Sequence, residues 1–470
     1  MKMNWNQLLS KNRFYPSTDE STPTFQTDYN TIICSTLFRR LQDKAQVFPL
    51  DEDDYVRTRL THSLEVSSIG KTLGEYTFRK LKDAEMDPWF TDHQEQVFSD
   101  ILLCAGLIHD IGNPPFGHFG EFAIREWFQA HLHELTLNGK PITKLLSDWQ
   151  LQDLCTFEGN AQSIRLLSKT PYQGTMHGFN LSYAVLASII KYPISSDRLA
   201  NDNPFHYKKI GYNYSERELF NAIDQNTGMN GYRHPLSYLL EAADDIAYRT
   251  SDVEDSMVKK VLGITQIFDA LEQYHDTLTD AAMKTSFAEC EEKLKTINRN
   301  EVAKKIRKPE LSAVQQWNQY LQTCMIHDAG DSFLRHYEEI MNGTFQGDLF
   351  DDTCSGHVIR AISNLSEKWI YTSSIKTKTE LYGRRVIDSL LTQFMPAAIK
   401  YDTDAPMTFI ECRIIDTVSD FYKSMYHAEA ERLAASAASD LLYLRILMIT
   451  DYISGMTDNY AKRLYQELFA

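Results

Sequence analysis

The stretch ILLCAGLIHDIGNPPFGHFGE, residues 101–121, holds an apolar run followed by a polar turn. The run over 101–108 is too short to span a membrane but long enough for a buried helix. His109 and Asp110 stand at its end, and a glycine and two prolines then force the chain to turn. Because a buried His–Asp pair costs free energy unless partners satisfy it, we expect this pair to bind a divalent metal together with further ligands.

Two other segments offer the further ligands. Upstream, His62 lies in a predicted helix with an inward-facing apolar stripe, and downstream Asp244 and Asp245 lie in an alanine-rich, otherwise apolar helix. Two imidazoles and two carboxylates suit Mn, Fe, Zn, Co or Ni better than Ca, and such a set tolerates Mg. The alternative is a structural cluster held together by hydrogen bonds alone.

Helical periodicity dominates the chain and predicts an all-α fold with few short strands. Helices are expected over 28–44, 59–82, 94–109, 121–134, 160–167, 181–191, 216–225 and 235–261. A short hairpin is expected around 208–214, and loops are expected at 16–26, 133–148 and 193–206.

Composition narrows the class of protein. The 48 basic and 64 acidic residues give a net charge of −16, which disfavours a protein that coats nucleic acids without sequence preference. An anionic substrate must therefore be attracted by a local cluster of cations. Seven dispersed cysteines without a CxxC motif indicate a reducing cytoplasm. Because the chain shows no signal-peptide core and no apolar run of membrane length, we expect a soluble cytoplasmic protein without membrane contact.

Seven short motifs in a fixed order are spread over most of the chain. They are FRRLQDKAQVF at 38–48, RLTHSLEV at 59–66, HDIGNPPFGH at 109–118, FEGNAQ at 157–162, KYP at 191–193, EAADDIAY at 241–248 and DYISGMTD at 451–458. Together they resemble the bacterial dGTP triphosphohydrolases, within the HD-domain phosphohydrolase superfamily. The resemblance implies an N-terminal segment (1–29), an HD-type catalytic core (30–261) and a C-terminal helical region (262–470) that completes the pocket and the subunit contacts.

The resemblance also implies a metal centre. Its ligands would be His62, His109, Asp110 and Asp244. Asp244 is preferred to Asp245 because, in the family, a tyrosine follows the metal aspartate by four residues, and here that tyrosine is Tyr248. Mn or Mg is the expected metal, and Fe, Co, Ni or Zn are alternatives.

Catalytic and substrate-binding residues follow from the same resemblance. His118, supported by Glu121, would transfer a proton, and the alternative for His118 is an ordinary polar residue at a helix N-terminus. The expected substrate contacts are Arg59, Lys191, Tyr192 and Lys209 at the triphosphate, Gln46 and Val47 at the sugar and base, Tyr248 at the deoxyribose and Asp252 at the 3′-hydroxyl. Taken singly, each lysine is more typical of a solvated surface, and a tyrosine in this position is also typical of a core.

The predicted reaction is metal-dependent hydrolysis of dGTP, or of several dNTPs, to deoxynucleoside and inorganic triphosphate. One alternative is a broader HD-type nucleotide phosphohydrolase. Another is a protein that senses nucleotides or single-stranded DNA on an HD scaffold, although the net charge does not support DNA as a ligand. The resemblance further implies a homo-oligomer, which in relatives is often a hexamer.

Overall fold

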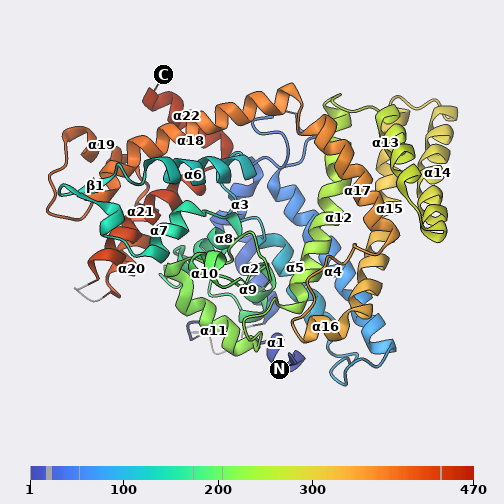
Figure 1. Cartoon of the computed structure of the whole chain (residues 1–470), viewed down its shortest axis with the longest axis horizontal. Coiled ribbons are helices and arrows are strands. Elements are labelled where there is room, and N and C mark those ends of the chain that lie inside the picture. Colours follow the sequence, from blue (N-terminus) through green and yellow to red (C-terminus); the bar gives the residue numbers. More distant parts are fainter. Residues whose placement is uncertain are drawn as a thin grey trace.

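The computed structural model describes residues 2–16, 24–51, 53–172, 174–203, 205–433 and 437–469. In this part of the chain, helices make up nearly all of the regular structure. The only sheet among these residues is a two-stranded hairpin of β1 (Thr136–Leu137) and β2 (Lys140–Pro141). The predicted all-α class is therefore confirmed (Figure 1). None of the described helices is both long and apolar enough to cross a membrane.

The helices follow one another along the whole chain. Those of the N-terminal half are α1 (Trp5–Leu8), α2 (Phe25–Ile33), α3 (Thr36–Arg40), α4 (Arg59–Asp83), α5 (Glu95–Ile108), α6 (His118–His131), α7 (Asp148–Cys155), α8 (Gly159–Lys169), α9 (Tyr183–Ile189), α10 (Ser196–Asn201), α11 (Arg217–Thr227) and α12 (Pro235–Val258). Those of the C-terminal half are α13 (Ile264–Thr277), α14 (Ala281–Ala303), α15 (Pro309–Arg335), α16 (Tyr337–Met341), α17 (Cys354–Leu365), α18 (Ser374–Lys400), α19 (Phe409–Thr417), α20 (Asp420–Ala430), α21 (Ala438–Ser454) and α22 (Asp458–Phe469).

Helices α4, α5, α12 and α15 pack against one another. The predicted metal ligands lie on α4, on α12 and directly after the C-terminal end of α5. Helix α4 begins with a capping box, in which Thr58 and Thr61 each accept the backbone N–H of the other. Helix α12 has Pro235 in its first turn, and the ring of His234 accepts the N–H of Leu236 at 3.1 Å. These start signals explain why α4 and α12 begin at the predicted residues.

The predicted helix over 28–44 is wrong as a single element. Helix α2 ends at Ile33, and α3 begins anew at Thr36 because the Ser35 hydroxyl accepts the N–H of Phe38 at 3.1 Å. A short 3₁₀ turn then carries the chain from Leu41 to Asp43. The break gives the chain a sharp corner just before the segment that carries Gln46.

The predicted hairpin at 208–214 is also wrong. The hairpin lies at 136–141, inside a stretch predicted to be a loop, and its two turn residues are Asn138 and Gly139 with φ of 49° and 76°. An Asn-Gly pair with positive φ at both positions is the preferred two-residue hairpin turn. The sequence therefore carried the correct signal at a different place.

Residues 208–214 instead run beside the KYP motif. The N–H of Gly211 donates to the carbonyl of Ile194 at 3.0 Å, and a Cβ at position 211 would lie only 2.0 Å from the carbonyl oxygen of Tyr192. Only glycine permits so close an approach. This pairing brings Lys209 to the same wall as Lys191 and Tyr192.

Two other boundaries differ from expectation. Helix α6 starts at His118, earlier than the predicted start at 121, and the predicted loop over 193–206 contains α10. Most of the predicted loop over 16–26 lies outside the described residues.

Two clusters of buried apolar side chains hold the helices together. One joins α2, α4, α5, α9 and α12 to α13–α17, and the other joins α6 and α7 to α18–α22. In Figure 1, α18 runs along the top of the molecule above α6. The C-terminal half thus packs against both groups of N-terminal helices, while a domain division at residues 261 and 262 stays a prediction.

Candidate active site

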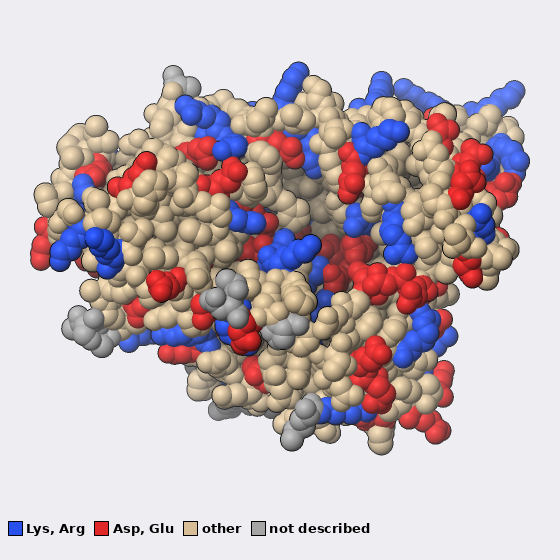
Figure 2. All heavy atoms as spheres, in the orientation of Figure 1, with Lys and Arg blue, Asp and Glu red and all other residues tan. Residues whose placement is uncertain are grey.

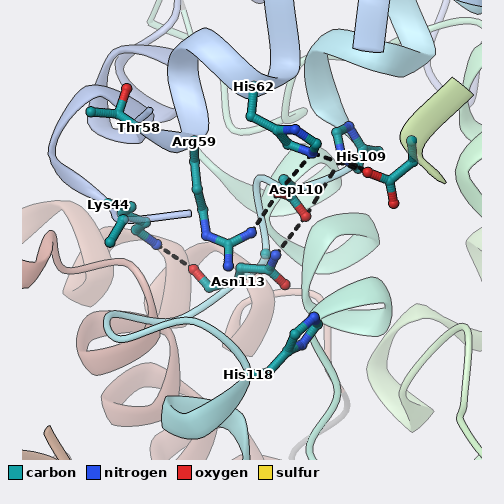
Figure 3. Close-up of polar contacts among 12 residues, drawn as sticks. Lys44, Thr58, Arg59, His62, His109, Asp110, Asn113 and His118 are labelled. Carbon is teal, nitrogen blue, oxygen red and sulfur yellow. Dashed lines mark hydrogen bonds and ion pairs between the residues drawn. The ribbon is translucent and has the colours of Figure 1, made fainter. Parts of the chain in front are cut away.

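The side chains predicted to hold a metal meet at the C-terminal end of α5 (Figure 3). The Nε2 atom of His62, from α4, lies 3.0 Å from Oδ1 of Asp244, from α12, and 4.0 Å from Oδ2 of Asp110. The Nε2 atom of His109 lies 3.6 Å from Oδ1 of Asp110 and 3.6 Å from Oδ1 of Asp244. Packing of three helices therefore brings together residues from three separate motifs.

The geometry of this cluster fits a divalent metal. His62, His109 and Asp244 each present one ligand atom, and these atoms all lie within 4.8 Å of one another. Nδ1 of His109 lies 2.8 Å from the Gly106 carbonyl, so the ring donates from Nδ1 and turns Nε2 towards the cluster. Among the described residues, this buried Nε2 has no hydrogen-bond partner. An unpartnered imidazole nitrogen beside carboxylate oxygens is a suitable donor set for Mn, Fe, Co, Ni or Zn.

Asp110 lies at the edge of the same cluster and is held there by two neighbouring side chains. Its two oxygens accept hydrogen bonds from Arg59 and from the side-chain amide of Asn113. Burial alone would raise the pKa of Asp110, but Arg59 and the two histidines outweigh burial and lower it to about 2. Asp110 is therefore anionic at neutral pH, which is the form that a metal ligand needs.

The cluster opens into a cavity of about 420 Å³. Every predicted site residue except Asp252 lines this cavity. The lining also includes residues that were not predicted to bind substrate: Asn113, Phe116, Phe119, Glu158, Asn160, Asp245, Tyr371, Lys376 and Glu380.

His118 and Glu121 form a pair on the first turn of α6. Nδ1 of His118 lies 3.2 Å from one oxygen of Glu121, while the other oxygen accepts the N–H of Gly159 at 2.9 Å. The His118 side chain is 78% exposed and the Glu121 side chain 3% exposed. Burial alone would raise the pKa of Glu121, but His118, Lys209 and the Gly159 N–H together lower it. A buried carboxylate thus holds an imidazole that faces the cavity.

The turn before His118 has an unusual backbone. Phe116 and Gly117 have φ of 64° and 63°. A bulky residue in this region is strained by on the order of 1–3 kcal/mol. A Cβ at position 117 would lie 2.8 Å from the Arg59 guanidinium, so glycine is needed both for its conformation and for space. The turn therefore brings Arg59 against the main chain beside His118.

Cations predicted to bind phosphate reach the cavity already paired with carboxylates. Lys191 forms an ion pair with Glu241, and Lys209 donates to Glu158 at 2.9 Å. Burial alone would lower the pKa of Lys191, but Glu241 outweighs it and raises the pKa. These two lysines are partly buried residues of the cavity wall, and a charged ligand must compete with their carboxylate partners.

Gln46, Val47 and Tyr192 complete another part of the wall. Val47 is buried in a small cluster with Ile370, and the buried side-chain oxygen of Gln46 has no hydrogen-bond partner within the described ranges. The ring of Tyr192 stands edge-on to that of Tyr207, with centroids 5.7 Å apart. Gln46 thus leaves a free acceptor at the cavity, as a residue that recognises a base or sugar needs.

Tyr248 lines the cavity, and Asp252 lies behind it. The Tyr248 and Tyr371 hydroxyls share a hydrogen bond, and the Tyr371 hydroxyl donates to Oδ2 of Asp252 at 3.0 Å. Burial raises the pKa of Asp252 to about 7. Asp252 does not line the cavity in this structure, and its contact with a 3′-hydroxyl stays a prediction.

Asp245, the alternative to Asp244 as a metal ligand, is not part of the cluster of possible ligands among the described residues. Its carboxylate lies 3.7 Å from Nε of Arg249, and no described hydrogen bond joins it to a histidine. Burial, together with the carboxylate of Asp348, raises the pKa of Asp245 to about 7. The helical spacing that separates Asp245 from Asp244 by about 100° explains why only Asp244 faces the two imidazoles.

Sequence reasoning missed Tyr371 and Lys376. The Lys376 ammonium lies 4.3 Å from the centroid of the Tyr371 ring, and burial lowers the pKa of Lys376. Both follow a π-helical turn at Ser366–Ile370. Such turns are frequent at functional sites but have no sequence signature, so nothing in the sequence marked this segment.

Comparison with known proteins agrees with the geometry. The HD domain family model matches residues 59–146, which include His62, His109 and Asp110. A deoxyguanosinetriphosphate triphosphohydrolase-like protein of Listeria monocytogenes is 40% identical over 482 residues, covering 99% of each chain. The deoxyguanosinetriphosphate triphosphohydrolase of Salmonella typhimurium is 30% identical over 516 residues, covering 100% of this chain and 98% of the relative. The chain therefore belongs to the deoxyguanosinetriphosphate triphosphohydrolase family of HD-domain hydrolases.

Proposed function

We propose that this protein is a metal-dependent hydrolase that converts dGTP to deoxyguanosine and inorganic triphosphate. The observation that carries the proposal is the placement of three kinds of group in one cavity. The cavity is lined by the cluster of His62, His109, Asp110 and Asp244, by the His118–Glu121 pair and by several cations. These groups are what cleavage of a phosphate ester next to a polyphosphate needs.

The cluster of imidazoles and carboxylates would hold the metal, with Mn or Mg expected. When bound, such a metal supplies Lewis-acid stabilisation of charge on the α-phosphate and lowers the pKa of water. Arg59, fixed beside Asp110, is placed to bind an oxygen of the same phosphate. Lys191 and Lys209 would then exchange their carboxylate partners for the β- and γ-phosphates.

His118 is placed to move the proton that the reaction requires. Its ring faces the cavity and its Nδ1 is held by the Glu121 carboxylate, so Nε2 is free to donate to a departing 5′-oxygen or to accept from water. The buried Glu121 carboxylate can stabilise a protonated imidazole, while solvent around the exposed His118 ring screens part of this interaction.

The Tyr248–Tyr371 pair supports selection of a deoxyribonucleotide. Their joined hydroxyls form a rigid polar wall backed by Asp252. A 2′-hydroxyl pressed against this wall would meet groups whose hydrogen bonds are already used, which costs affinity. The resemblance, rather than any contact in the cavity, is the basis for guanine as the base.

Product analysis tests the proposal. Purified protein with Mn or Mg is incubated with dGTP or GTP, and the nucleoside and phosphate products are separated by chromatography over time. We expect deoxyguanosine and intact triphosphate from dGTP, and slower turnover of GTP by roughly 10²- to 10³-fold in kcat/KM. Release of pyrophosphate with dGMP would refute the proposed cleavage, and equal turnover of all four dNTPs would remove only the guanine assignment.

Partners beyond the nucleotide stay predictions. In Figure 2, basic and acidic side chains are interspersed on the visible face, and no continuous basic surface covers it, which does not favour single-stranded DNA as the main ligand. A homo-oligomer is supported by large apolar side chains that are exposed in the single chain, such as Phe409 and Ile410 at 74% and 64%. Light scattering of the purified protein tests the expected hexamer.

A further inference from the structure

The DYISGMTD motif, residues 451–458, has no part in the proposed chemistry, yet it forms hydrogen bonds with Ala45 and Phe116, which line the cavity. It spans the end of α21 and the first residue of α22. Three earlier segments of the chain donate hydrogen bonds to it. The donors and acceptors are Arg40 to the Gly455 carbonyl, Lys44 to the Ser454 carbonyl, the Ala45 and Phe116 N–H groups to Asp458, and Gln162 to Asp451 and Ser454.

Asp458 joins the segment that carries Gln46 to the turn that precedes His118. Its Oδ2 accepts the N–H of Ala45 at 3.0 Å, and its Oδ1 accepts the N–H of Phe116 at 2.9 Å. Asp458 is only 2% exposed, so these bonds are shielded from water. One buried carboxylate thus fixes the main chain of two segments that line the cavity.

Lys44 makes a second connection between the DYISGMTD motif and the turn before His118. The buried ammonium of Lys44 donates to the carbonyls of Asn113 and Ser454, the latter at 2.9 Å. Figure 3 shows this bond between Lys44 and the Asn113 main chain. Because the Asn113 side chain in turn donates to Asp110, residue 113 links Lys44 to the metal cluster.

The Phe116 turn needs such support. Its positive φ is unfavourable for a phenylalanine, and the turn must be held by contacts from elsewhere in the fold. One contact is the bond to Asp458, and another comes from α18, where a Cβ at Gly383 would lie 2.6 Å from the Phe116 ring. His118 is two residues from this turn, so the position of its ring depends on the turn conformation.

We infer that Asp458 is a positioning residue, which sets the place of the His118 ring by fixing the Phe116 turn to the Ala45 loop. The inference rests on the proposed function, in which His118 moves a proton. A carboxylate suits the role because both of its oxygens accept hydrogen bonds, whereas an asparagine would turn an N–H₂ group towards one of the two backbone N–H groups.

Kinetics of Asp458→Asn test the inference against a matched control. Thr457→Ala removes the side chain that accepts the N–H of Tyr460 at 3.3 Å and so weakens the start of the same helix without a bond to either loop. We expect D458N to lower kcat for dGTP about 10- to 100-fold with KM within about threefold, as expected when a proton-transfer group is misplaced. T457A should keep kcat within about twofold, and D458E, which retains two acceptor oxygens, should keep more activity than D458N.

A double-mutant cycle distinguishes positioning from general damage. If Asp458 acts through His118, D458N should lower kcat by less than about threefold in an H118A background. An equal fold loss in both backgrounds, or wild-type kcat in folded D458N, would overturn the inference. Should D458N fail to fold, Lys44→Met removes the hydrogen bonds to the Asn113 and Ser454 carbonyls and is expected to show the same dependence on His118.

Hydrogen exchange gives a readout that needs no turnover. In D458N, amides in peptides covering residues 44–48 and 113–119 should exchange at least about tenfold faster, while T457A leaves them unchanged. Unchanged exchange in these peptides would also overturn the inference. If the wild-type protein hydrolyses no dGTP but exchange rises as expected, the proposed function fails and the structural link stands.

Discussion

Glu121→Gln is the most direct test of the catalytic pair. The substitution keeps the shape of the side chain, and its amide oxygen can still accept the N–H of Gly159, which lies 2.9 Å from the carboxylate. The atom that faces Nδ1 of His118 at 3.2 Å becomes an N–H₂ donor. The lowered pKa of Glu121 means that wild type presents a carboxylate at neutral pH, so the change removes a charge from behind the imidazole.

The size of the effect follows from that hydrogen bond. A hydrogen bond to a charged group contributes about 1.5–3 kcal/mol. Since each 1.4 kcal/mol is a factor of ten, E121Q should lower kcat roughly 10- to 150-fold. The 78% exposure of His118 lets water stabilise part of the imidazolium charge, so we expect a loss near the lower end of this range.

Steady-state rates of deoxyguanosine release measure the effect, with kcat and KM determined across pH. Glu126→Gln is the matched control, because Glu126 lies on the same helix but pairs with Arg384 at 2.9 Å, away from His118. KM of E121Q should stay within about threefold, since Glu121 acts through His118. A kcat within twofold of wild type, or a change in KM alone, would show that the pair does not assist proton transfer.

Three further expectations follow from the structure. His109→Ala should lose stoichiometric metal, measured by elemental analysis, while circular dichroism keeps its helical signal; retained metal would contradict the ligand assignment. His118→Ala should lower kcat about 10²- to 10⁴-fold yet still bind dGTP in a direct binding assay. Burial raises the pKa of Asp153 from 3.8 to about 7, so the folded state holds this proton more tightly and the free energy of unfolding falls as pH rises from about 4 to 7. Asp153→Asn removes that slope, so its melting temperature relative to wild type should rise between pH 4 and pH 7, and an unchanged difference would contradict the assigned pKa.

The sequence determined the helices and the metal cluster well because both depend on local signals. His62 and Asp244 lie on helices whose capping residues are visible in the sequence, and His109 directly follows the apolar run that forms α5. Packing three such helices leaves few ways to place their polar residues. The helix break at Ser35 was less visible, because a serine inside a helical pattern caps a new helix only when the chain can turn there.

Apart from the metal cluster, contacts between distant segments could not be predicted. Tyr371 reaches Asp252 across 119 positions, and Asp458 reaches Phe116 across 342. No periodicity connects such residues, because their contact is set by how the C-terminal helices pack on the first half of the chain. For the same reason the carboxylate partners of Lys191 and Lys209 became apparent only in three dimensions.

The pre-formed ion pairs of the cavity carry a consequence for inhibition. Glu241 forms ion pairs with Lys191 and, at 2.5 Å, with Arg233. Glu158 forms an ion pair with Lys209. An entering anion must displace these carboxylates, so a single orthophosphate exchanges one partner for another with little net gain. A triphosphate can engage several cations at once, and each contact after the first is intramolecular. We therefore expect the cavity to bind a triphosphate much more tightly than orthophosphate. Abundant cellular phosphate should then compete only weakly with the nucleotide.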